Sequence, residues 1–236
     1  MTLPKKISPC PIVDSILELR FATSFPHDAI FGIVYNAFKS DYPRYESLPI
    51  LQLPEPVRKA DPNLKFKPYY RLSNDKFVIQ IGADVATISS FPEYVGWDIF
   101  KTEITSFFNT IKALAIIDDV SRIALRVINF FPDVDIFQQA KIALIISEEP
   151  IVSQKTLLNT GFVYDHGINS TLNISNDAMI NLTQGSIIDI DTFREYNKVF
   201  DVYSIISEIE MIHDKEKALF FSLLKDDFLK KFNPEY

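Results

Sequence analysis

The chain has 236 residues, a formal net charge of −7 and a hydrophobic content of 47%. These values allow one large domain or two closely packed halves with a full core. The acidic balance disfavours binding to nucleic-acid phosphates or to anionic lipid, although a local basic patch remains open.

The N-terminal region and the single cysteine bear on the compartment. Lys5 and Lys6 are followed by prolines and acidic residues, not by the apolar stretch of a signal peptide. No window approaches the roughly 20 consecutive apolar residues of a membrane helix. Cys10 is the only cysteine, which excludes an internal disulfide and is typical of a reducing compartment. We therefore expect a soluble, cytoplasmic protein without membrane contact.

The first elements are a strand and a helix. Over residues 12–22, Leu17, Leu19 and Phe21 alternate with Glu18 and Arg20, which predicts a half-buried strand. After Pro26, apolar residues at helical spacing predict a helix to about Ser40.

Residues 41–115 fall into three parts with different sequence patterns. The segment 41–68 holds six prolines and little periodicity, so it is interpreted as a long irregular excursion. Short apolar runs at 69–72, 77–81 and 85–91 predict an antiparallel meander. From Glu93 an apolar stripe predicts a long helix to about Ala115. The stripe consists of Trp97, Phe100, Ile104, Phe107, Phe108, Ile111 and Leu114.

The second half has a similar order of elements. From Ser121 a strand is expected in which Arg122 and Arg126 face away from Ile123 and Leu125. A short helix after Pro132 follows. Further strands are expected near 142–147, 156–164, 168–174, 178–182 and 187–193. A long helix is expected from about Phe200 to Phe232, with a possible kink at His213 and Asp214.

Matching residues in the two halves indicate an internal duplication. Seven residues recur 106 positions later: Ser15, Leu19, Arg20, Phe25, Pro26, Ile30 and Phe31 as Ser121, Leu125, Arg126, Phe131, Pro132, Ile136 and Phe137. Gly82 recurs as Gly185, and the residues from Trp97 to Phe100 recur as those from Phe200 to Tyr203, at an offset of 103.

The repeated order predicts an α+β fold made of two tandem units, 1–118 and 119–236, packed about a pseudo-twofold axis with antiparallel sheets. Each unit resembles the helix-grip or TATA-binding-protein-like arrangement, in which a curved sheet wraps a long C-terminal helix. That likeness concerns element order and carries no function.

Three stretches also carry a family resemblance. They are residues 9–13 with 18–21, residues 122–129, and His213 followed by Phe220, Phe221 and Leu223. Together they resemble an uncharacterised, sporadically distributed family of bacterial proteins of about this length. Cys10 departs from the proline or small residue expected there. The family has no established activity, so the resemblance implies no mechanism.

No cofactor, metal or catalytic residue is expected. His27, His166, His213 and Cys10 are scattered, whereas a zinc site needs converging nitrogen or sulfur ligands. The six glycines are too dispersed for a phosphate-binding loop. Cys10 lies between two prolines and is interpreted as an inert small residue.

Two groups of residues are candidates for binding. Glu18, Arg20, Arg122 and Arg126 occupy the polar faces of the two corresponding strands. They form either an anion-binding floor or an ion-pair network that joins the halves, with Glu18 paired to Arg126 or Arg122. His213 is either a proton carrier or a helix-packing residue.

The leading functional hypothesis is a non-enzymatic binding or protein-interaction module with an unknown protein partner. The segment 41–68 would border its groove. The alternative is a small-molecule-binding protein or a cryptic enzyme that uses a cavity between sheet and helix. A closed, mainly apolar pocket would favour this alternative, and a broad exposed apolar patch would favour a partner surface. Nucleic-acid binding is the least favoured reading.

Overall fold

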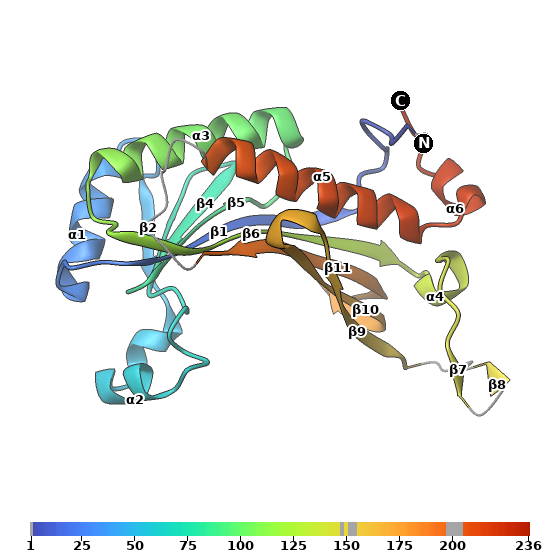
Figure 1. The fold of residues 1–236 in the computed structure, drawn as a ribbon, viewed down its shortest axis with the longest axis horizontal. Helices are drawn as coiled ribbons and strands as arrows, with labels where there is room; N and C mark the ends of the chain where they lie inside the picture. The colour runs from blue at the N-terminus through green and yellow to red at the C-terminus, as the bar shows by residue number, and fades with distance from the viewer. Residues whose placement is uncertain (1, 147–148, 151–154, 197–204) are drawn as a thin grey trace.

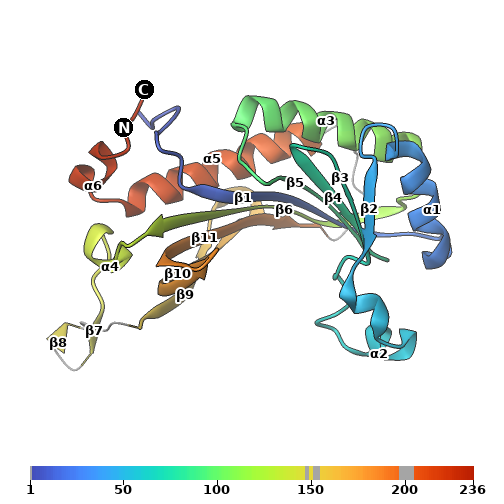
Figure 2. The ribbon, with the colours of Figure 1, turned by 180° about the vertical axis from the view of Figure 1, so that it is seen from behind.

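The computed structural model describes residues 2–146, 149–150, 155–196 and 205–236. It is a mixed α+β structure built on one open sheet of nine antiparallel strands, in the order β2-β3-β4-β5-β1-β6-β11-β10-β9. The sheet is strongly curved, and the long helices α3 and α5 lie along one of its faces (Figure 1). Chain ends are adjacent, as both views show (Figures 1 and 2).

The elements before residue 118 follow the expected order. They are β1 (Ile12–Ala22), α1 (His27–Phe38), β2 (Arg44–Ser47), a 3-10 turn (Pro49–Gln52), α2 (Glu55–Ala60), β3 (Tyr70–Ser73), β4 (Phe77–Ile81), β5 (Val85–Ser90) and α3 (Trp97–Ala113). The expected strand at 12–22, the helix after Pro26, the meander and the long helix are therefore confirmed.

The segment 41–68 is more regular than expected. It contains the edge strand β2, the 3-10 turn and the helix α2. Prolines stand in the first turns of both helical pieces, where a missing N–H costs no hydrogen bond. The interpretation as an irregular excursion is therefore wrong. The sequence does not reveal these elements because each is too short to show periodicity.

The elements after residue 118 also match in outline. They are β6 (Asp119–Pro132), α4 (Ile136–Gln139), β7 (Ile145–Ile146), β8 (Glu149–Pro150), β9 (Leu157–Val163), a 3-10 turn (Asp165–Gly167), β10 (Ile168–Ile180), β11 (Thr183–Glu195), α5 (Ile205–Leu223) and α6 (Asp226–Lys230).

Two expectations for this half are corrected. Residues 178–182 are not a separate strand, because β10 continues through a bulge to Ile180. The last helix runs without a break past His213 and ends at Leu223, and α6 follows as a separate helix. The expected start at Phe200 lies outside the described residues.

The two central strands bring the halves together. β1 pairs with β6, so that Leu17 lies opposite Leu125 and Leu19 lies opposite Ile123. These side chains are buried on the face that carries α1, α3 and α5, which we call the helix face. Glu18, on the opposite or open face, alternates with them. The predicted alternation in β1 is confirmed.

Two apolar clusters fill the space between the helix face and the helices. The larger one joins α1, α3, the first turns of α5 and the central strands, and the smaller one joins the end of α5 and α6 to β10 and β11. Five residues of the apolar stripe predicted for α3 are buried: Phe100, Ile104, Phe107, Phe108 and Ile111. In α5, Ile205, Ile209 and Leu223 are also buried. Trp97 is only partly buried, because it lies at the exposed beginning of α3.

The strand pairing tests the two repeat offsets separately. Arg20 of β1 pairs with Val85 of β5, and Arg126 of β6 pairs with Asp191 of β11. The two positions of the second pair each lie 106 residues after those of the first, so this offset agrees with the strand pairing. Gly82 lies in the turn between β4 and β5, whereas Gly185 lies inside β11 opposite Pro132. The predicted equivalence of these two glycines is therefore wrong. The matching residues 200–203 lie outside the described part of the chain.

In the described residues, none of the helices combines the length and the apolar character that crossing a membrane requires.

Candidate functional site

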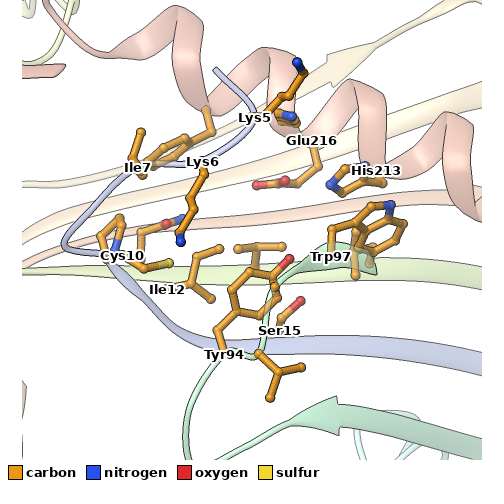
Figure 3. A pocket seen from close by; sticks show the side chains of 18 of the residues that line it. Lys5, Lys6, Ile7, Cys10, Ile12, Ser15, Tyr94, Trp97, His213 and Glu216 are labelled. Carbon is orange, nitrogen blue, oxygen red and sulfur yellow. The ribbon is translucent and has the colours of Figure 1, made fainter. Parts of the chain in front are cut away.

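A cavity of about 730 Å³ lies on the helix face of the sheet (Figure 3). Its floor comes from the central strands β1 and β6, and its other walls come from α5, the beginning of α3 and the N-terminal segment. Most of the cavity surface is apolar, and the apolar side chains in the lining are Ile7, Pro11, Ile12, Val95, Trp97, Ile99, Leu125, Val127, Phe220 and Phe221. The polar side chains in the lining are Lys5, Lys6, Cys10, Ser15, Tyr94, Asp98, Asn129, His213, Glu216 and Lys217.

The N-terminal segment is held over the cavity by backbone hydrogen bonds to the C-terminal region. The Lys5 N–H donates to the Glu235 carbonyl at 2.6 Å, and the Ser8 N–H donates to the Phe232 carbonyl at 2.6 Å. At its other end, the Pro11 carbonyl accepts a 2.8 Å hydrogen bond from the Phe130 N–H of β6. The segment therefore forms a wall fixed at several points.

Glu216 is the most unusual group in the cavity. Its residue is 5% exposed, and its side chain extends from α5 into the cavity (Figure 3). Within the described part of the chain, no hydrogen bond or ion pair reaches its carboxyl group. Desolvation raises the pKa of Glu216 to about 8, against the weaker opposite effect of Lys217. The carboxyl group is therefore mostly protonated at neutral pH.

His213 and Trp97 form the side of the cavity next to Glu216. Their rings are stacked with centroids 3.7 Å apart and an interplanar angle of 2°. Burial, and next the charge of Lys217, lower the pKa of His213 to about 4, so the imidazole is neutral at pH 7. Its Nδ1 atom is buried and lacks a hydrogen-bond partner. Trp97 is fixed by a 3.3 Å hydrogen bond from its Nε1 to Glu210.

Tyr94 and Cys10 face the same space from the opposite side (Figure 3). Desolvation raises the pKa of the Tyr94 phenol well above its ordinary value, so its hydroxyl stays protonated. Desolvation also raises the pKa of the Cys10 thiol, which keeps it in the less nucleophilic form. Both groups are therefore uncharged and suited to hydrogen bonding.

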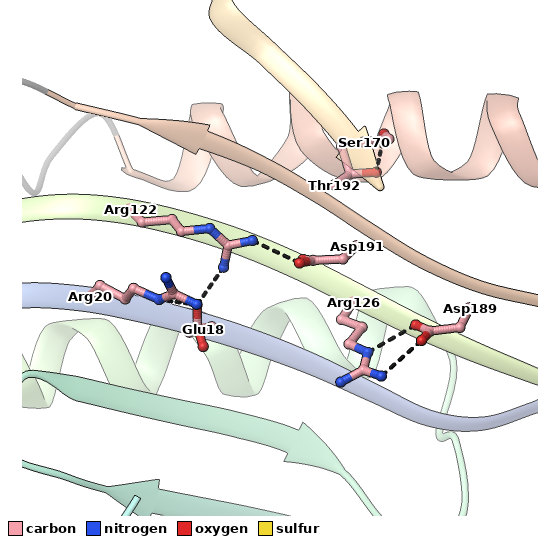
Figure 4. A network of polar contacts seen from close by, with 8 residues as sticks. All are labelled: Glu18, Arg20, Arg122, Arg126, Ser170, Asp189, Asp191 and Thr192. Carbon is pink, nitrogen blue, oxygen red and sulfur yellow. Dashed lines mark hydrogen bonds and ion pairs between the residues drawn. The ribbon is translucent and has the colours of Figure 1, made fainter. Parts of the chain in front are cut away.

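Four of the five residues predicted as a site lie on the open face instead (Figure 4). The Arg122 guanidinium donates to Glu18 and, at 2.7 Å, to Asp191. Arg20 donates to the same Glu18 oxygen at 2.7 Å. Arg126 makes two hydrogen bonds with Asp189, at 2.8 and 2.7 Å.

The predicted ion pair between Glu18 and an arginine of the second half is confirmed, with Arg122 as its partner. Arg126 pairs with Asp189 and not with Glu18. The three arginines of this group are matched by three carboxylates, those of Glu18, Asp189 and Asp191. This balance fits an ion-pair network between the halves and not an anion-binding floor. The fifth predicted residue, His213, is separated from the other four by the sheet.

Glu216 was not predicted from the sequence, although a signal for it exists. It stands four residues after Ile212 and four before Phe220, both of which are buried. An acidic residue at this position interrupts the apolar stripe of α5, and such a position is expected to point into the core. The contributions of Lys6 and Tyr94 depend on tertiary contacts and have no local signal.

The described residues contain no group of three or more histidine, cysteine, aspartate or glutamate side chains placed to hold a metal ion.

Comparison of the chain with models of protein families finds no match, and comparison with curated proteins finds none either. The resemblance to an uncharacterised bacterial family stays a prediction.

Proposed function

We propose that this chain is a small-molecule-binding protein whose ligand occupies the cavity between the central strands and α5. The observation that supports this most strongly is the Glu216 carboxyl group, which extends into the cavity and for which the described residues supply no hydrogen-bond partner. Burial removes water from this carboxyl group, which costs free energy in its charged form and raises its pKa. A ligand that pairs with it would recover part of that free energy.

The form of the cavity supports the same proposal. Ligand sites are concave, mainly apolar and provided with a few convergent polar groups, within roughly 300–1,000 Å³. The cavity has apolar walls and a volume of about 730 Å³. Glu216, Tyr94 and Asn129 supply polar atoms from three different elements. This arrangement fits the alternative drawn from the sequence better than the protein-interaction module, which stays a prediction. No catalytic role is proposed.

Native mass spectrometry of the purified protein tests the proposal. We expect a bound small molecule on the wild-type chain. Ser15→Phe should reduce its occupancy severalfold, because Ser15 is buried in the cavity floor and the ring fills ligand space. Ser24→Phe is the matched control, since Ser24 is exposed outside the cavity.

A second variant, Val127→Phe, also places a ring in the cavity and is used in case Ser15→Phe fails to fold. Circular dichroism checks the folding of both variants. A ligand-free wild-type protein whose Trp97 fluorescence responds to no apolar dye would overturn the proposal. Equal ligand occupancy in wild type, Ser15→Phe and Val127→Phe would also overturn it, because the ligand would then lie elsewhere.

For the fold, we propose that units 1–118 and 119–236 derive from one duplicated helix-grip unit. The pairing of β1 with β6 supports this, because Glu18 lies opposite Ala124, its own counterpart at the offset of 106. Strands β5 and β11 flank this central pair symmetrically. Superposition of residues 12–22 and 85–90 on 118–128 and 191–196 tests the proposal. A poor fit would contradict the duplication.

A further inference from the structure

The lining of the cavity contains more positive than negative charge at neutral pH, although the whole chain is acidic. Three lysines line it, from the N-terminal segment and from α5, against two acidic residues. One of those two, Glu216, is mostly protonated at pH 7 because its pKa is about 8. Lys5 donates a 3.2 Å hydrogen bond to the Tyr236 carbonyl oxygen. Lys6 and Lys217 are the remaining cations.

The beginning of α3 adds further hydrogen-bond donors. Gly96, Trp97 and Asp98 line the cavity, and among the described residues no side chain caps this helix end. The first N–H groups of a helix carry partial positive charge and are suited to an anion. The buried Glu216 carboxyl, which extends into the same cavity, is an independent indication that a polar ligand group is bound here.

We propose that the cavity binds an apolar monocarboxylate. Its carboxylate group lies beside Lys6, the beginning of α3 and the Glu216 carboxyl, and its apolar part contacts Leu125, Val127 and Phe220. This inference rests on the proposed small-molecule-binding function and specifies its ligand. A protonated Glu216 donates a hydrogen bond to the ligand, whereas an ionised Glu216 repels it.

Seven other titratable groups line the cavity with Glu216. They are Lys5, Lys6 and Cys10 from the N-terminal segment, Tyr94 and Asp98 near the start of α3, and His213 and Lys217 from α5 itself. His213 is neutral above about pH 4. Glu216 is therefore the acid whose proton controls binding between about pH 7 and pH 9.

Octanoate, octylamine and octanol test this proposal, because they share one chain length and differ in charge. Their affinities are measured through the fluorescence of Trp97, the only tryptophan, and by calorimetry. At pH 7 we expect octanoate to bind about tenfold or more tightly than the other two. Its affinity should fall about tenfold between pH 7 and pH 9, as the protonated fraction of Glu216 falls.

Two variants identify the groups responsible. Glu216→Gln replaces the O–H donor of the protonated carboxyl group with an N–H donor that does not titrate. This variant should therefore bind octanoate at pH 7 and lose most of the pH dependence. Lys6→Met should weaken octanoate severalfold without weakening octanol. Lys39→Met is the control, because Lys39 lies outside the cavity lining and bonds Asn36 on the exposed side of α1.

Tightest binding of octylamine, with an affinity that rises with pH, would overturn the proposal and indicate a cationic ligand. Failure of all three probes would also overturn it. A ligand retained in native mass spectrometry would still support the proposed function in either case, so the two failures are distinguishable.

A second inference concerns the outer edge of β9, which pairs with no further strand among the described residues. This strand ends the nine-stranded sheet and contains no charged residue, whereas the opposite edge strand β2 carries Arg44 and Glu46. Charged residues protect edge strands from pairing with other chains. The side chains of Leu157 and Val163 in β9 are 74% and 84% exposed.

Backbone groups along this edge alternate in a way that suits a further strand. The Thr156 carbonyl accepts from Asn176, and the Tyr164 N–H donates to Ile168, so even-numbered residues bond to β10 and its turn. In an antiparallel sheet the residues between them direct their N–H and C=O groups outward. These residues are Leu157, Asn159, Gly161 and Val163.

We propose that β9 pairs antiparallel with β9 of a second copy of this chain, about a twofold axis at Thr160. In this register Leu157 lies opposite the partner's Val163, so that two exposed apolar side chains cover each other. Lys155, which pairs with Asp177 of its own chain at 3.1 Å, and Asp165 of the following 3-10 turn flank the paired strands at their two ends. The result is one continuous sheet across both copies.

Analytical ultracentrifugation of the full chain tests this proposal. We expect a dimer at tens of micromolar protein, and a monomer for Val163→Lys, which places charges on the interface. Leu182→Lys should remain dimeric, because Leu182 is 93% exposed in the turn between β10 and β11. A monomeric wild-type protein, or a dimer that Val163→Lys leaves intact, would refute the pairing through β9.

Discussion

Arg122 of β6 holds Glu18 of β1 and Asp191 of β11 in a single guanidinium fork. The three residues come from adjacent strands, so one side chain joins β1 of the first half to β6 and β11 of the second half. The Arg122 side chain is 9% exposed and stacks 4.4 Å above the Phe193 ring. Planar stacking and two-sided hydrogen bonding favour arginine over lysine here.

Arg122→Met is therefore expected to lower the free energy of unfolding by about 2–4 kcal/mol. The cost comes mainly from Asp191, which loses its hydrogen-bonded cation, and in part from Glu18, which keeps only Arg20. A surface pair is therefore a suitable control. Arg44→Met should cost less than about 1 kcal/mol, because Arg44 and Asp75 are 57% and 91% exposed. Urea unfolding measures both values, and equal costs would contradict the role of the network.

The glycine in β11 permits close contact with β6. A Cβ atom on Gly185 would lie 2.3 Å from the Phe131 carbonyl oxygen and 2.9 Å from the Phe130 ring. We expect Gly185→Ala to destabilise the protein by about 3 kcal/mol, because backbone must move. Gly32→Ala in α1 is the control, since no atom lies within 4 Å of its added methyl group.

Because alanine favours helix over glycine, Gly32→Ala should raise stability by about 0.5–1 kcal/mol. Thermal unfolding of the two variants should therefore show a lower melting temperature for Gly185→Ala and a higher one for Gly32→Ala, although the chemical change is the same. A neutral Gly185→Ala would mean that β6 and β11 are less tightly apposed.

Phe107 tests the core between α1 and α3. It is 1% exposed, and its ring lies 5.7 Å from that of Phe38. Phe107→Ala should cost about 3–5 kcal/mol through lost burial and the cavity left behind. Ile99→Ala in the same helix should change stability by less than about 0.5 kcal/mol, because Ile99 is 55% exposed. Chemical denaturation that gives similar costs for both would contradict the core assignment.

Elements with strong periodicity were predictable from the sequence. The alternation around Leu17 and Leu19 identified β1, and the apolar stripe through Phe100 and Phe107 identified α3. The offset of 106 also predicted that β1 and β6 are corresponding strands, and hence an ion pair of Glu18 with Arg126 or Arg122. The structure shows Arg122 as the partner. This ion pair was predictable because the charged residues alternate with apolar ones in both strands and the repeat relates the two strands. Their pairing at the centre of the sheet brings the two polar faces side by side.

Other features depend on contacts that a local pattern does not contain. The short elements between residues 44 and 60 lack enough turns to show a period. The cavity depends on the N-terminal segment, which is held by residues more than 200 positions away. Glu216 was not singled out from the sequence, although its spacing from Ile212 and Phe220 placed it on the buried side.

The titrations of Glu216 and His213 are expected to oppose each other in the pH dependence of stability. The pKa of Glu216 is about 8 when folded, above its ordinary 4.5, so its contribution is complete below about pH 4.5 and is lost as pH rises towards 8. The pKa of His213 is about 4 when folded, below its ordinary 6.5. Its contribution is present above about pH 6.5 and is lost as pH falls towards 4.

Between about pH 4.5 and pH 6.5 the two effects largely cancel, and above pH 6.5 the loss from Glu216 remains. Glu216→Gln should therefore gain stability relative to wild type by about 1 kcal/mol per pH unit from pH 6.5 to pH 8. His213→Gln should leave this slope unchanged and remove the opposing effect at lower pH. Urea unfolding at several pH values measures the differences. A Glu216→Gln curve parallel to that of wild type above pH 6.5 would show that Glu216 is ionised in the folded protein.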